Sequence, residues 1–190
     1  LSVNQVRALT TAQVAALTTD QVAAMSNAQV AALTTDAIKA LTTDAVVALT
    51  TGQVKSLTTQ QVSSLTATQI AAIETADVQV LNSNQLVALT TSQAQALTTD
   101  QLVALSARQV ASMETADVAA LSTDQLVSLT SGQVAALTTN QFSHMTTAQV
   151  AALTTDQLVK VSTQDLTALT TDQVRALTTD QIGALLTNQV

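Results

Sequence analysis

The chain alternates apolar and polar positions with a period of eight residues, and no insertion or deletion interrupts that period. When Leu1 is taken as position one, a large aliphatic residue returns at every eighth place. The substitutions in this column stay apolar: Met25, Ile73, Met113, Met145 and Val161. A second apolar column occupies position six, from Val6 through Phe142 to Val190, with Ala94 as its smallest member. The consensus octad is Leu-Thr-Thr-Asp-Gln-Val-x-Ala.

Charged residues indicate which columns face solvent. Basic residues stand at position seven in Arg7, Lys39, Lys55 and Arg175, and a column of aspartates occupies position four: Asp20, Asp36, Asp44, Asp100, Asp124, Asp156, Asp172 and Asp180. Charged side chains are almost never fully buried unless they are paired. The pattern therefore predicts that positions four and seven lie outside and that positions one and six form the interior.

Neither a straight helix nor a plain strand accommodates this octad. Eight residues of α-helix overshoot two full turns by about 80°, so the leucine column would wander around the helix. In a strand, positions one and six would point to opposite faces because side chains alternate. The octad needs a backbone that changes direction once per repeat.

The polar half of the octad predicts where each helix starts. Thr-Thr-Asp-Gln matches a capping box, in which a hydroxyl at the N-cap and Gln at N3 satisfy each other's backbone amides. In residues 17–22, Thr18 would be the N-cap and Gln21 the N3 residue. Leu17 and Val22 would form the hydrophobic staple, and Asp20 would lie at the positive end of the helix dipole.

We therefore expect an all-α superhelical solenoid of short capped helices, one per octad. A β-solenoid with stacked Thr rows is the alternative. A helix of about six residues is unstable alone in water, so the octads must stack to bury both columns. The prediction is one solenoid over residues 1–190, with about 24 octads and no linker. Residues 47–86 resemble residues 87–126, which fits either a five-octad superhelical turn or the duplication of a gene segment.

Composition narrows the function. The net charge of −7 disfavours a phosphate backbone as a partner, so nucleic acid is not expected. Polar residues interrupt every apolar stretch well before the length of a transmembrane helix, so no membrane span is expected either. Cysteine is absent, which leaves the redox compartment undetermined. The chain lacks an initiator Met and stops within an octad, so we interpret it as a segment of a longer protein.

Few residues carry candidate chemistry. His144 is the single histidine, and a substitution tolerated beside Phe142 and Met145 is a simpler interpretation than a base or a metal ligand. The carboxylate pairs Glu74 with Asp77 and Glu114 with Asp117 could bind a hard cation such as Ca²⁺, or could replace Thr and Gln at the cap. We expect no catalytic residue, no metal site and no cofactor, and hence no enzyme.

The segments at residues 9–17 (LTTAQVAAL) and 121–129 (LSTDQLVSL), each an octad with the first leucine of the next, resemble repeat tracts of very large secreted or surface proteins of Gram-negative bacteria, often adhesin-like. The resemblance covers the whole chain and implies an extracellular or cell-surface stalk that joins the rest of a parent protein. It supplies no functional residues. The octad also resembles the start of TAL-effector repeats, but their longer period and base-reading loop are absent.

Two functional hypotheses follow from the sequence. The first is a structural spacer that projects another domain, because no octad is distinctive enough to be a site. The second is a binding module that uses the solenoid surface for a protein, or rows of position-three hydroxyls such as Thr19, Thr35 and Thr43 for a glycan or ice.

Overall fold

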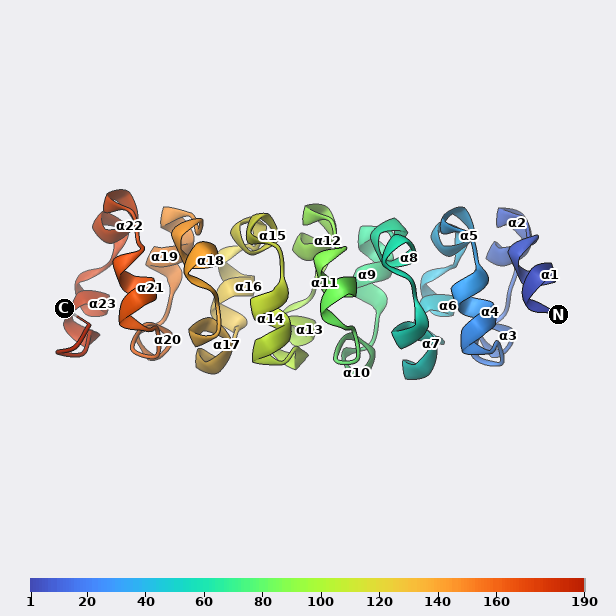
Figure 1. The fold of residues 1–190 in the computed structure, drawn as a ribbon, viewed down its shortest axis with the longest axis horizontal. Coiled ribbons are helices and arrows are strands. Elements are labelled where there is room, and N and C mark those ends of the chain that lie inside the picture. Colours follow the sequence, from blue (N-terminus) through green and yellow to red (C-terminus); the bar gives the residue numbers. More distant parts are fainter. Residues whose placement is uncertain (190) are drawn as a thin grey trace. The chain divides into compact units, whose positions relative to one another are not determined.

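The structure is a computed structural model that describes residues 1–189, and this range contains helices and turns but no strand (Figure 1). Each complete octad contributes one α-helix of four to six residues. The all-α prediction is confirmed, and the β-solenoid alternative is wrong. Val190, assigned to the second apolar column, lies outside the described residues.

The chain divides into two compact units, Leu1–Leu97 and Thr98–Val190, which we call the N-terminal unit and the C-terminal unit. That the whole chain is one solenoid stays a prediction. The helices of the N-terminal unit are α1 (Val3–Arg7), α2 (Thr11–Ala15), α3 (Thr19–Ala23), α4 (Asn27–Ala32), α5 (Thr35–Ala40), α6 (Thr43–Val47), α7 (Thr51–Ser56), α8 (Thr59–Ser64), α9 (Ala67–Ala72), α10 (Thr75–Val78), α11 (Ser83–Val87) and α12 (Thr91–Ala96). Those of the C-terminal unit are α13 (Thr99–Ala104), α14 (Ala107–Ser112), α15 (Thr115–Ala120), α16 (Thr123–Ser128), α17 (Ser131–Ala135), α18 (Thr139–Ser143), α19 (Thr147–Ala152), α20 (Thr155–Leu158), α21 (Thr163–Thr167), α22 (Thr171–Ala176) and α23 (Thr179–Ala184).

Two to four residues separate one helix from the next. After α7, for example, Leu57 has φ −57° and ψ 135°, and the following N-cap Thr58 has φ −73° and ψ 158°. The amide of Leu57 donates to the carbonyl of Val54 at 3.2 Å, which tightens the last turn before the chain leaves the helix. No described residue has a positive φ. Helices here end without the left-handed glycine cap, which explains why glycine is so scarce.

Within each unit, helices that are three apart in chain order pack against each other. In the N-terminal unit α4 contacts α1 and α7, and in the C-terminal unit α16 contacts α13 and α19 (Figure 1). Three octads, or 3 × 8 = 24 residues, therefore complete one superhelical turn in each unit. The five-octad turn is wrong, and duplication remains as the explanation of the 40-residue echo.

The two apolar columns form the interior, as the sequence predicts. Position-six residues such as Ile38, Leu102 and Phe142 are fully buried, and most position-one leucines are nearly so. Aspartates at position four and basic residues at position seven are exposed. The exceptions to burial lie in the first and last turns, where Leu1 and Ile182 are exposed.

Neighbouring residues of one helix provide a test of this packing. Leu126 is fully buried at position six, whereas Val127, at position seven, is 38% exposed. We expect Leu126→Ala to lower the free energy of unfolding by about 2–5 kcal/mol, because it leaves a cavity in a packed interior. The matched variant Val127→Ala should change it by less than about 0.5 kcal/mol. Urea unfolding followed by circular dichroism measures both, and equal effects would contradict the assigned interior.

Candidate functional site

In a helix of four to six residues, almost every backbone group belongs to the first or the last turn. An α-helix leaves its first four amides and last four carbonyls without partners inside the helix, so few groups of such a short helix are satisfied internally. Unpaired backbone groups are costly to bury. The arrangement that supplies these partners is the one chemically distinctive feature that every turn of the solenoid repeats.

Positions two and five satisfy the amides at the start of each helix. At α8 the amide of Gln61 donates to Oγ1 of Thr58 at 3.2 Å, and the amide of Thr58 donates to Oε1 of Gln61 at 2.9 Å. The same pair joins Thr18 and Gln21 at α3, as predicted from the capping box. In every described helix except α10 and α15 the N-cap side chain accepts from the N3 amide.

The other end of the position-five glutamine reaches the preceding superhelical turn. Nε2 of Gln61 donates to the carbonyls of Val30 at 2.9 Å and Leu33 at 2.8 Å, which are 31 and 28 residues earlier in the chain. These carbonyls lie where α4 ends and the chain leads into α5. One side chain therefore caps its own helix and binds the end of another.

This double contact, which we call the glutamine clamp, repeats along both units. In the N-terminal unit, Nε2 of further glutamines donates to carbonyls 28 and 31 residues earlier: Gln53, Gln69, Gln85 and Gln93. In the C-terminal unit the same is true of Gln133, Gln141, Gln149, Gln157, Gln173, Gln181 and Gln189. All of these except Gln189 are buried.

The clamp needs glutamine and no other residue type. It requires an acceptor for the N-cap amide and two N–H donors on the same side-chain terminus, and glutamate offers no donor when ionised. Sequence analysis recognised the cap but missed the contact between turns. A signal was present, because glutamate suits N3 of a capping box equally well, yet position five holds only Gln, Asp or Ala.

Octads with another residue at position five lack the glutamine clamp, and the hydrogen bonds that remain depend on the residue. Ala37 and Ala45 keep only the hydrogen bonds from their amides to the N-cap hydroxyls of Thr34 and Thr42. Asp165 is buried and accepts from Oγ1 of Thr139, in the preceding turn, at 2.6 Å. Aspartate is too short to reach the carbonyls, and a position-three hydroxyl takes their place as its partner.

Burial perturbs the carboxyl of Asp77, which occupies position five in α10. Its side chain is buried in the N-terminal unit, and this desolvation raises its pKa above the ordinary value of 3.8. The negative charge of Glu74 raises the pKa further, whereas a hydrogen bond from the hydroxyl of Thr51 opposes the shift. Asp77 therefore places a carboxyl at position five, where most octads have the neutral side-chain amide of glutamine.

The other candidate residues from the sequence do not come together in one site. Glu74 and Glu114 take the place of Thr at the N-cap of α10 and α15, as the sequence suggested, but neither side chain forms the cap hydrogen bond. His144 is exposed at the end of α18, where Nδ1 lies 2.8 Å from the carbonyl oxygen of Asn140. Within residues 1–189, no group of three or more histidine or carboxylate side chains is arranged to hold a metal ion.

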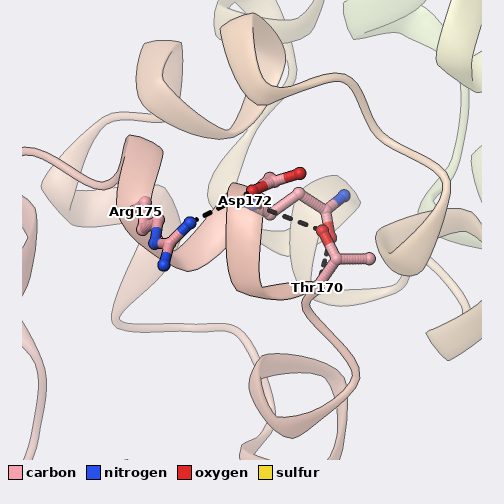
Figure 2. A network of polar contacts seen from close by, with 4 residues as sticks. Thr170, Asp172 and Arg175 are labelled. Carbon is pink, nitrogen blue, oxygen red and sulfur yellow. Dashed lines mark hydrogen bonds and ion pairs between the residues drawn. The ribbon is translucent and has the colours of Figure 1, made fainter.

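Ion pairs between exposed side chains contribute little to the stability of the fold. Figure 2 shows Arg175 beside Asp172 on α22, where the guanidinium lies 3.7 Å from the carboxylate and both side chains are more than three-quarters exposed. Such pairs are worth little in water. Thr170 is the N-cap of the same helix, and its hydroxyl accepts from the backbone amide of Gln173.

The contact between turns can be separated from the cap by comparing two glutamines. Gln61 makes both contacts, whereas Gln13 is exposed and its side chain binds only Thr10. Gln61→Ala should lower the free energy of unfolding by about 2–4 kcal/mol, because two buried carbonyls lose their donor. Gln13→Ala should cost about 1 kcal/mol or less. Chemical denaturation measures both, and equal losses would show that the clamp adds nothing beyond the cap.

Asp77 makes the stability of the protein depend on pH. Because its pKa is raised in the folded state, the folded chain binds the proton more tightly, and the contribution of Asp77 is favourable below about pH 3.8. That contribution is lost as the pH rises through the raised pKa. We therefore expect Asp77→Asn to be more stable than the parent at neutral pH, with the difference shrinking toward pH 3. Urea unfolding between pH 3 and 7 checks this, and the exposed Asp44→Asn controls for loss of one charge.

No helix among the described residues is long and apolar enough to cross a membrane. A comparison with curated proteins found no match. The model of the ALTTAQ repeat matches residues 1–27, 23–51, 70–107, 110–147 and 159–190, and its six-letter motif is found unchanged at residues 8–13. In this motif the position-two Thr and the position-five Gln are the two residues of the cap. Since the matched segments cover most of the sequence, the chain belongs to the ALTTAQ repeat family.

Proposed function

We propose that the chain is a structural repeat segment that acts as a stalk or spacer in a bacterial surface or secreted protein. The observation that carries the proposal is the glutamine clamp. Within each unit, the clamp glutamines fix one superhelical turn to the turn before it, at two carbonyls with a constant separation in sequence. A spacer requires this kind of repeated rigid joint and requires no convergent site.

The uniformity of the octads supports the same proposal. Adding three octads adds one superhelical turn with every contact repeated, so length can change in steps without new chemistry. Solenoid repeats behave in this way because each repeat contacts only its neighbours. The extracellular or cell-surface location depends on the resemblance to bacterial repeat tracts alone.

The alternative, a binding module for protein, glycan or ice, receives less support from the position of the hydroxyls. Position-two hydroxyls are engaged as helix caps. Position-three hydroxyls such as Thr19, Thr35 and Thr43 are exposed, but Thr35 and Thr43 belong to adjacent octads. With three octads per turn, Thr19 and Thr43 lie one turn apart on the same side and Thr35 lies on another side, so the position-three hydroxyls are divided among three rows and do not form a single face.

Distances between spin labels test the spacer directly. Asp20, Thr68 and Ser92 are exposed at position four of octads separated by whole turns. The chain has no cysteine, so Asp20→Cys can be paired with Thr68→Cys or with Ser92→Cys without background labelling. We expect two narrow distributions whose centres differ by about 8–10 Å, the separation of packed helices.

Broad or overlapping distributions would contradict a rigid spacer, and the same samples in urea give the reference for a flexible chain. The location is tested separately by treating intact producing cells with protease. Cleavage of the chain before lysis supports a surface role, and protection until lysis contradicts it.

A further inference from the structure

Glutamine clamps are distributed unevenly among the turns of the N-terminal unit. Three octads make one superhelical turn, so as many as three glutamines can join a turn to the one before it. The turn formed by α8, α9 and α10 is joined by Gln61 and Gln69. The turn formed by α5, α6 and α7 is joined by Gln53 alone, because Ala37 and Ala45 occupy position five in two successive octads.

The two alanines leave backbone groups without the partners that glutamine provides. At α8, Gln61 accepts from the N-cap amide of Thr58 and donates to the carbonyl of Leu33, 28 residues earlier. At α5 and α6 the equivalent carbonyls belong to Leu9 and Leu17, and neither accepts a hydrogen bond from a described residue. The contact of α5 and α6 with the turn before them therefore lacks the side-chain hydrogen bonds that join the next turn.

Apolar packing still holds this contact closed. Ala37, Ile38, Ala45 and Val46 are all buried, α5 packs against α2, and α6 packs against α3. Hydrophobic contacts are not directional, whereas each clamp binds carbonyls at one place. A segment opens more readily when fewer buried hydrogen bonds hold it. The contact is thus packed at rest but requires less free energy to open than the contact made by the turn α8–α10.

We propose that the contact of α5, α6 and α7 with the turn before them is a weak joint, which opens before the joint made by α8, α9 and α10. A solenoid in which every joint is the same has no preferred place to open, and two successive alanines create one. Local opening is then confined to one defined turn, while the turns with two clamps stay folded. The proposal depends on the missing clamps and is independent of the spacer function.

Hydrogen exchange of backbone amides compares the two joints. The amides of Ile38 in α5, Val46 in α6 and Val62 in α8 each donate to the carbonyl of their own N-cap residue, so their local hydrogen bonds are the same. Such amides exchange only when the structure around them opens. Nuclear magnetic resonance in deuterium oxide should show faster exchange at Ile38 and Val46 than at Val62. Equal exchange at the three amides would overturn the proposal.

Restoring the glutamines separates a missing clamp from any effect of position along the chain. Ala37→Gln with Ala45→Gln provides two further clamps, so exchange at the two amides of the weak joint should slow by on the order of tenfold or more. Ala12→Gln with Ala28→Gln makes the same change at exposed position-four sites and should leave exchange unaltered. If the restored chain folds, as judged by circular dichroism, and its exchange is no slower, the proposal is wrong.

The converse variant moves the weak joint and covers the case in which the added side chains disturb the fold. Gln61→Ala with Gln69→Ala leaves the turn α8–α10 without a clamp, so exchange at Val62 should accelerate by on the order of tenfold or more. Gln60→Ala, at an exposed position of the same helix, is the matched control. Unchanged exchange at Val62 in the folded double variant would contradict the role assigned to the clamps.

Discussion

The structure depends on one constraint, which is that helices of four to six residues cannot satisfy their own backbone. The glutamine at position five provides hydrogen-bond partners both at the start of its own helix and at the end of an earlier one. Its side-chain oxygen accepts a hydrogen bond from the backbone amide of the N-cap residue, and its side-chain NH₂ group donates to backbone carbonyls where an earlier helix ends. Because those carbonyls are 28 and 31 residues away, a local capping interaction also determines how the turns stack.

This coupling explains why the octads follow one another without a single insertion or deletion. One extra residue would shift the apolar columns after it against those before it, and it would change the separation of 28 and 31 residues for the glutamines whose carbonyls precede it. It also explains why residues other than glutamine at position five keep fewer hydrogen bonds. Alanine gives up the clamp at Ala37 and Ala45, whereas Asp165 recovers one contact with the preceding turn through Thr139. Asp77 occupies the same position at the cost of a raised pKa.

Much of the fold could be predicted from the sequence because its determinants are local. The hydroxyl and glutamine three residues apart predict each helix start, and the charged columns predict the exposed faces. The number of octads per turn could not be predicted, because it depends on contacts between residues such as Gln61 and Leu33. No periodicity within the octad contains that information. The second role of glutamine was missed because a capping box already explains its presence at N3.

Hydrogen exchange of the glutamine side-chain amides tests the central claim most directly. Nuclear magnetic resonance resolves each Nε2 group, and groups held in buried hydrogen bonds exchange only when the structure opens. The account predicts slow exchange in deuterium oxide for Gln53, Gln61 and Gln69, in step with the backbone amides of the interior. The exposed groups of Gln13 and Gln21 should exchange rapidly. Equally rapid exchange at all five positions would contradict the glutamine clamp.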